Sequence, residues 1–182
     1  GIAAGYFGGW TDSVISRCTE ALLAAPFLIL AIALAAFLGP SLGNAMIAIG
    51  LSATPIFIRL TRGQVISVAA EDYVESANAI GLPTMKILSR YIFPNVLPPV
   101  LVQATLTVAT AIIAEASLSF LGLGMPPSQP SLGSLISNGF KYIHSDRYWL
   151  SIYPGLALMV TVVAINLVGD QVRTVLDPMN IR

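Results

Sequence analysis

Long runs without a charged residue dominate the chain. The four longest cover residues 21–58, 91–114, 116–140 and 148–169. A helix needs roughly 20 mostly apolar residues to cross the ~30 Å hydrocarbon core of a bilayer. The pattern therefore predicts several membrane-spanning helices.

The boundaries of these helices follow from the residues that interrupt the runs. Gly39-Pro40-Ser41 predicts a tight turn inside the first run, since glycine and proline both interrupt helices. Pro26 and Pro55 fall within predicted spans, which membrane helices tolerate where neighbours satisfy the freed carbonyls. We predict complete spans at residues 20–38, 43–60, 96–118 and 150–172, with a helix remnant at 1–9. The expected fold class is all-α, a polytopic membrane helix bundle forming one domain over residues 1–182.

Composition supports the membrane prediction and narrows the function. Charged residues make up 10% of the chain, against about 25% in soluble domains, and hydrophobic residues make up 55%. The net charge of zero gives no indication of nucleic-acid binding, and the single Cys18 excludes an internal disulfide. No Cys/His cluster predicts a metal site. Because the chain has no initiator methionine and begins as an apolar helix already under way, we expect it to be N-terminally truncated.

The distribution of basic residues predicts the orientation. Cytoplasmic loops carry an excess of Lys and Arg. If the 61–95 loop is cytoplasmic, seven of the nine basic residues lie inside: Arg17, Arg59, Arg62, Lys86, Arg90, Arg173 and Arg182. Lys141 and Arg147 then lie outside, in an extracytoplasmic segment at 119–149, where we expect a short helix over 132–142. The C-terminus is expected to be cytoplasmic.

The 61–95 loop has the pattern of two short helices. Acidic residues open the first helix, where they favour its positive end, Gly81 suits its left-handed end, and Pro83 suits the first turn of the second. One face of each helix is apolar at helical spacing: Tyr73, Val74, Ala77 and Ile80 on the first, and Met85, Leu88 and Ile92 on the second. A docking helix for another protein and an amphipathic helix lying on the membrane both fit this pattern.

Specific motifs add a family resemblance. Glu75-Ser76-Ala77, three further residues, Gly81 and a later Ile92-Phe93-Pro94 resemble the Glu-Ala-Ala (EAA) loop of ABC importer permeases, with Ser76 and Phe93 as mild departures. Three other segments are similar to the second permease of dipeptide and oligopeptide importers: residues 5–10 with Asp12, residues 114–124, and residues 166–170 with Arg173 and Leu176-Asp177-Pro178. Glu20, Leu132 and Thr174 depart from that subfamily's usual residues.

The resemblance implies a type I ABC importer permease, which translocates di- or oligopeptides across a bacterial inner membrane. It implies a second homologous permease, two cytoplasmic ATPase subunits docking on the 71–94 loop, and an extracytoplasmic solute-binding protein. The residues carried over to the docking role are Glu75, Ser76, Ala77, Ile80, Gly81 and Pro94. The same machinery importing nickel or glutathione is the alternative.

Polar residues near or within the spans have two interpretations each. Glu115 is either a pathway or gate residue or a helix-packing hydrogen-bond partner, since a mid-membrane carboxylate costs roughly 2.5–3.5 kcal/mol. Asn166 either lines the pathway or bonds across helices. The pairs Asp170/Arg173 and Arg17/Glu20 have the three-residue spacing of interfacial ion pairs, and substrate ligands are the alternative.

Two other function classes are less consistent with the sequence. An intramembrane hydrolase needs a nucleophile with its base or a metal motif, and neither Gly-x-Ser-x-Gly nor His-Glu-x-x-His is present. An ion-coupled carrier usually places ionisable groups at the midplane, whereas here they lie mainly at helix ends. The chain also lacks the Gly-x4-Gly-Lys-Ser/Thr phosphate loop. We therefore expect no catalytic residue and no cofactor on this chain, with ATP bound by partner subunits.

Overall fold

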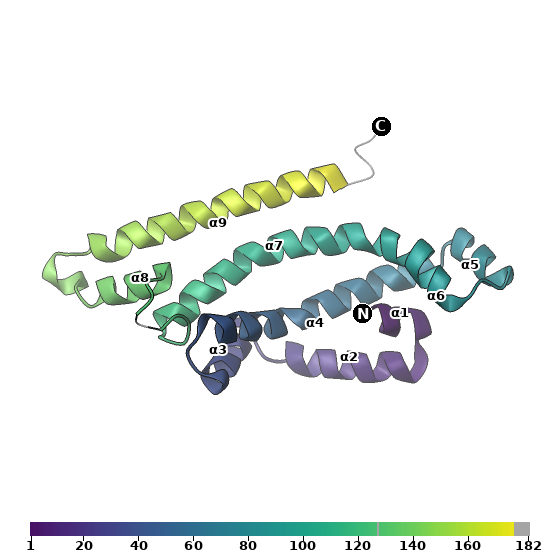
Figure 1. The fold of residues 1–182 in the computed structure, drawn as a ribbon, viewed down its shortest axis with the longest axis horizontal. Helices are drawn as coiled ribbons and strands as arrows, with labels where there is room; N and C mark the ends of the chain where they lie inside the picture. Colours follow the sequence, from purple (N-terminus) through teal and green to yellow (C-terminus); the bar gives the residue numbers. More distant parts are fainter. Residues whose placement is uncertain (127, 177–182) are drawn as a thin grey trace. The chain divides into compact units, whose positions relative to one another are not determined.

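The computed structural model describes residues 1–126 and 128–176, and every regular element among them is helical, as predicted (Figure 1). Asp177 and Pro178 of the predicted closing motif, and Arg182, lie outside the described residues. The helices are α1 (Ile2–Phe7), α2 (Gly9–Leu23), α3 (Phe27–Leu38), α4 (Leu42–Ala69), α5 (Asp72–Ala79), α6 (Thr84–Ile87), α7 (Phe93–Phe120), α8 (Leu132–Phe140) and α9 (Trp149–Leu176). A π-helical turn, Leu88–Ile92, joins α6 to α7, and a 3-10 turn, Ile143–Ser145, follows α8.

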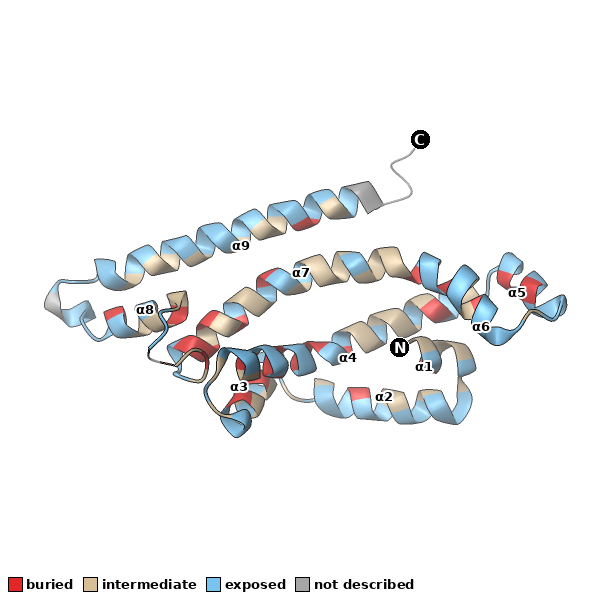
Figure 2. Cartoon of the chain, viewed as in Figure 1, coloured by how far each residue is buried: buried red, intermediate tan, exposed pale blue. Residues whose placement is uncertain are grey.

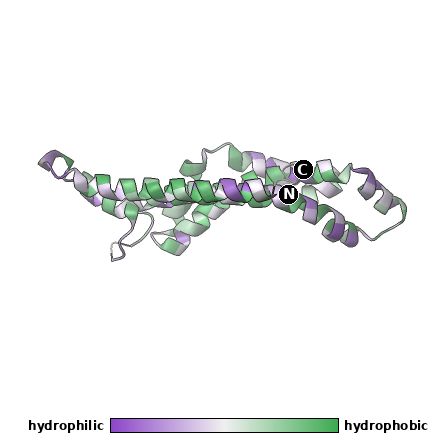
Figure 3. Ribbon diagram, turned by 90° about the horizontal axis from the view of Figure 1, so that it is seen from above, coloured by the Kyte–Doolittle hydropathy of each residue, from purple (hydrophilic) through white to green (hydrophobic). Residues whose placement is uncertain are grey.

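Three of the described helices are long and apolar enough to cross a membrane. They are Leu42–Ala69, the continuous stretch Thr84–Phe120, and Trp149–Thr174. The predicted spans 43–60, 96–118 and 150–172 lie within them. Figure 3 shows apolar residues along these helices, and Figure 2 shows that α9 has few buried residues. Helices that expose apolar side chains along most of their length are suited to a lipid or protein environment rather than to water.

The predicted span 20–38 is not one straight helix. α2 ends at Leu23, α3 begins at Phe27, and the two are bent by 89°. Pro26 stands between them with an extended backbone (φ −56°, ψ 136°). Proline has no N–H to donate and disfavours helical geometry in the residue before it. A break here is therefore the expected physical result. The two helices together are still apolar enough for one broken span, with Pro26 at the break rather than inside a continuous helix.

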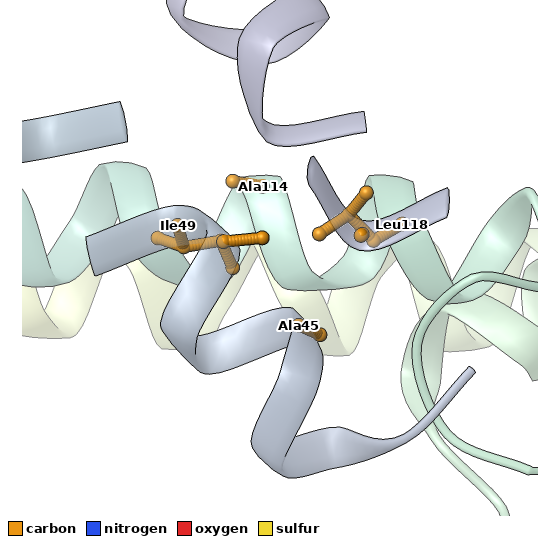
Figure 4. Packing of buried hydrophobic residues seen from close by; sticks show 6 residues of the cluster. Ala45, Ile49, Ala114 and Leu118 are labelled. Carbon is orange, nitrogen blue, oxygen red and sulfur yellow. The ribbon is translucent and has the colours of Figure 1, made fainter. Parts of the chain in front are cut away.

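The chain forms two compact units. Among the described residues, the first contains Gly1–Ala24, Thr54–Ala104 and residues 173–176, and the second contains Ala25–Ala53 and Thr105–Val172. The second unit is centred on a cluster of small and branched residues (Figure 4): Ala35, Ala45, Ala48, Ile49, Ala114 and Leu118. Alanines at these positions let helix backbones approach closely, as in membrane helix packing.

Helix α8 confirms the short helix predicted after residue 131. Ser131 caps it: the Ser131 Oγ accepts the Ser134 N–H at 3.1 Å, and the Ser134 Oγ accepts the Ser131 N–H at 2.9 Å. Gly133 contacts the backbone of Ala116 on α7 so closely that a Cβ would collide with its carbonyl oxygen. Ser151 on α9 donates its hydroxyl to the Ile136 carbonyl at 3.1 Å. Within the second unit, α8 is thus fixed to both neighbouring helices.

Candidate functional site

The connection between α4 and α7 is shorter and more helical than the predicted 61–95 loop. α4 continues to Ala69 and α7 already begins at Phe93. We refer to residues 70–92, which contain α5, α6 and the π-helical turn, as the α5–α6 segment (teal in Figure 1). All of it belongs to the first unit.

Helix α5 begins and ends as its sequence predicts. Asp72 and Glu75 occupy the first turn, where carboxylates interact favourably with the helix dipole. Gly81 has φ +80°, a left-handed conformation that glycine adopts without steric cost. The N–H of Gly81 then bonds the Asn78 carbonyl at 2.9 Å, and the N–H of Leu82 bonds the Ala77 carbonyl at 3.2 Å. These bonds close the helix end and direct the chain into α6.

Pro83 precedes α6 rather than lying in its first turn. Its backbone is extended (φ −62°, ψ 140°), and its carbonyl accepts the N–H of Lys86 at 2.9 Å. α6 then runs through the π-helical turn directly into α7, and Pro94, which has no N–H to donate, lies two residues past the end of that turn. The second half of the segment is therefore a continuation of a long helix.

A buried cluster fastens the segment to α4. Its members come from α4, α5, α6, the π-helical turn and α7, in that order: Val65, Val74 and Ala77, Ile87, Ile92, and Val96. Each is at most 4% exposed. A movement of α5 is therefore transmitted to both long helices through close-packed side chains, which deform little.

Only part of the apolar face predicted for each of the two short helices is buried. Val74, Ala77 and Ile92 are buried, but Ile80 is 78% exposed and Met85 is 77% exposed. Ile80 follows the last turn of α5 and so leaves its face. In the second helix, Ile87 is buried in place of Met85, because the π-helical turn widens the repeat to five residues between Ile87 and Ile92.

The residues predicted for docking divide between the two sides of the segment. Glu75, Ser76, Ile80, Gly81 and Pro94 are exposed. Ala77 is 4% exposed and belongs to the buried cluster. The segment thus presents a surface with a carboxylate, a hydroxyl, an exposed isoleucine and a glycine bend, while Ala77 supports that surface from beneath.

Sequence reasoning missed the contacts made by the first 23 residues, which we call the α1–α2 elbow. Tyr6 and Ile2 pack against the buried cluster, and the Tyr6 hydroxyl lies 3.5 Å from the Asn78 Oδ1 on α5. Asp12 on α2 accepts two bonds from Arg62 on α4, at 2.5 Å from Nε to Oδ1 and 2.6 Å from Nη2 to Oδ2. No short-range pattern could reveal a pair fifty residues apart.

The polar residues singled out as pathway candidates lie in the second unit. Glu115 on α7 is half-buried and accepts the Ser119 hydroxyl at 2.6 Å, and the Ser119 Oγ accepts the Met125 N–H at 3.3 Å. Asn166 is half-buried on α9. The Glu115 contacts fit a packing role, and a gate role for Glu115 or Asn166 stays a prediction. The Arg17–Glu20 pair is confirmed, at 3.4 Å between exposed side chains.

Comparison with known proteins agrees with the resemblance found in the sequence. Residues 1–181 match the family described as "Binding-protein-dependent transport system inner membrane component". A dipeptide transport system permease protein of Alkalihalophilus pseudofirmus is 44% identical over 178 residues, 98% of this chain and 58% of that protein. A probable D,D-dipeptide transport system permease protein of Escherichia coli is 40% identical, over 98% of this chain and 59% of that protein.

A third relative, a di/tripeptide transport system permease protein of Pseudomonas aeruginosa, is 39% identical over the same share of this chain and 58% of its own length. The chain therefore spans somewhat more than half the length of these relatives. With its apolar helices, this match identifies a multi-pass membrane protein. The chain belongs to the family of binding-protein-dependent transport system inner membrane components.

Proposed function

We propose that this chain is part of the permease subunit of an ATP-driven peptide importer, and that the exposed side of the α5–α6 segment docks onto an ATPase subunit. The observation that carries the proposal is the division of the segment into an exposed side and a close-packed side. A partner that grips the exposed side can move the long helices, because the other side is fixed to α4 and α7. An amphipathic helix lying on lipid would instead direct its apolar face to the membrane.

Peptides are the solute class that we propose. The three relatives described above are named for dipeptides, D,D-dipeptides and di/tripeptides, and none of these three for nickel or glutathione. The proposed assembly contains a second homologous permease, two cytoplasmic ATPase subunits that bind ATP, and an extracytoplasmic solute-binding protein. This chain itself would carry no cofactor and no catalytic residue.

The docking experiment uses the full-length permease purified with its partners. Glu75→Lys reverses the charge of an exposed docking residue, and Gly81→Val places a β-branched residue at φ +80°, a genuine outlier for such a side chain. Both variants should insert into the membrane but lose co-purification of the ATPase and solute uptake. Gly63→Ala is the matched control, because a Cβ at this helical glycine meets no atom within 4 Å. Normal ATPase retention by both test variants would refute the docking surface.

The proposed topology places the α5–α6 segment and the C-terminus in the cytoplasm and α8 outside. It can be tested by cysteine labelling in a Cys18→Ser background, since Cys18 is the only cysteine of the chain. A membrane-impermeant maleimide should label Asn138→Cys in intact spheroplasts and Asp72→Cys only in inside-out vesicles. Both positions are exposed in the structure. The reverse labelling pattern would contradict the orientation.

A further inference from the structure

The α1–α2 elbow is attached to α4 at two successive positions. At the first, a Cβ added to Gly5 would lie 2.8 Å from the Cβ of Val65 and 2.9 Å from the carbonyl oxygen of Arg62, so α1 contacts the α4 backbone closely. At the second, the guanidinium of Arg62 holds the Asp12 carboxylate with two parallel bonds. Arg62 therefore contacts α1 with its backbone and α2 with its side chain.

Between these two attachments the chain turns at two glycines. Gly8 and Gly9 both have positive φ, +62° and +53°, and a Cβ at either meets no atom within 4 Å. Glycine adopts these backbone angles without steric cost, and no neighbouring atom lies close enough to the two Cα atoms to contact a side chain there. The bond between Asp12 and Arg62 is therefore one of the contacts that fix the direction of α2.

The first attachment also reaches the α5–α6 segment. Val65, which contacts Gly5, is the α4 member of the buried cluster that contains Val74 and Ala77 of α5. Tyr6 packs on the same cluster and approaches Asn78 of α5. Contacts thus run continuously from α5 through Val65 to Arg62 and from there to α2.

We propose that Asp12 and Arg62 are positioning residues of the transport cycle, which make α2 move together with the α5–α6 segment. The inference rests on the proposed function, since it takes the segment to be the site where the ATPase acts. The bidentate geometry suits this role, because two parallel bonds between a guanidinium and a carboxylate fix orientation as well as distance. A single flexible contact would let α2 move independently of α4.

The surroundings of the pair show that it is not merely a buried structural contact. The Arg62 and Asp12 side chains are 36% and 22% exposed. Arg62 also lines a hollow of about 150 Å³, together with Ser16, Thr19, Glu20, Ile58 and Arg59. Ser16 donates its hydroxyl to Asp12 Oδ1 at 3.1 Å.

The test uses the complete transporter in liposomes, with both permeases, the ATPases and the binding protein. It measures ATP consumed per peptide imported and, separately, the ATPase retained on purification. Asp12→Asn removes the charge of the carboxylate, and Arg62→Lys keeps the positive charge but cannot form the planar two-bond contact. Each should raise ATP consumption per imported peptide at least about fivefold, the lower end of couplings between distant sites, with ATPase retention unchanged.

The double variant Asp12→Arg with Arg62→Asp should restore the ratio to within about twofold, the usual error of additivity. Arg17→Lys is the matched control, because it makes the same change as Arg62→Lys at a side chain of α2 that is 86% exposed, and it should leave the ratio unchanged. An unchanged ratio in both single variants, no recovery in the reversed pair, or loss of assembly in Arg62→Lys would overturn the proposal. Failure of the docking proposal gives a different result, namely ATPase retention that survives Glu75→Lys and Gly81→Val.

Discussion

Replacing Ile87 by alanine tests how the α5–α6 segment is held. Ile87 is 1% exposed and lies in the cluster with Val65 and Val74. The substitution removes three carbons, worth about 0.8 kcal/mol each, or about 2.4 kcal/mol. The cavity left behind brings the expected cost to about 3 kcal/mol, within the roughly 2–5 kcal/mol found for such changes. Because the cluster fixes the segment, this cost should appear as local opening of α5 and α6.

Hydrogen exchange of the full-length permease in nanodiscs, without ATPase subunits, measures this opening directly. A cost of about 3 kcal/mol corresponds to a roughly 100-fold faster exchange of the amides that open with the segment, since each 1.4 kcal/mol is about tenfold. Met85→Ala is the control, because Met85 is two residues away on the same short helix but 77% exposed. It should change exchange little. Equal exchange in the two variants, or faster exchange in Met85→Ala, would refute the assignment of the buried face.

Two further predictions concern the second unit. Gly133→Ala should lower the thermal unfolding temperature, because the added Cβ collides with the α7 backbone at a cost of about 1–3 kcal/mol. Gly155→Ala is the control and should not lower it, since a Cβ there meets no atom within 4 Å. Equal unfolding temperatures of the two variants would contradict the close packing of α8. Ser119→Ala should destabilise the folded protein by about 1–2 kcal/mol, because the half-buried Glu115 carboxylate loses its hydrogen-bond donor. Ser117→Ala is the control and should destabilise it less, because Ser117 donates only to the Ile113 carbonyl one turn back. Uptake lost by Ser119→Ala at full thermal stability would instead assign Glu115 to the gate.

The long helices were predictable because their signal is local. Uncharged runs of more than twenty residues place α7 and α9 within a few residues and give the start of α4, although α4 continues nine residues past its predicted end. Gly81 and Asp72 mark the ends of α5 for reasons of backbone and dipole alone. The motifs at Glu75 and Gly81 likewise indicated the family, which the comparisons then confirmed.

Other features depended on geometry that the sequence does not express. The π-helical turn shifts the helical repeat, so that Ile87 rather than Met85 is buried. Proline disfavours helical geometry in the residue before it, so the break at Pro26 had a local signal. Pro55, however, lies inside α4, so a proline in an apolar run does not by itself predict a break. The pair of Asp12 and Arg62 joins residues fifty positions apart and arises only once α2 folds back onto α4.

The central claim is that α5 receives force from a nucleotide-driven partner, and cysteine cross-linking in intact cells tests it most directly. Ser76 is exposed on α5, and in a Cys18→Ser background Ser76→Cys would be the chain's only thiol. Because cytosolic thiols are kept reduced, a membrane-permeant oxidant is added to accept the two electrons. The account predicts that it then forms a disulfide between this cysteine and one introduced in the ATPase subunit, with a yield that changes when ATP is trapped on the complex. Peptide uptake at the normal rate, with no cross-link to the ATPase at any introduced position, would contradict it.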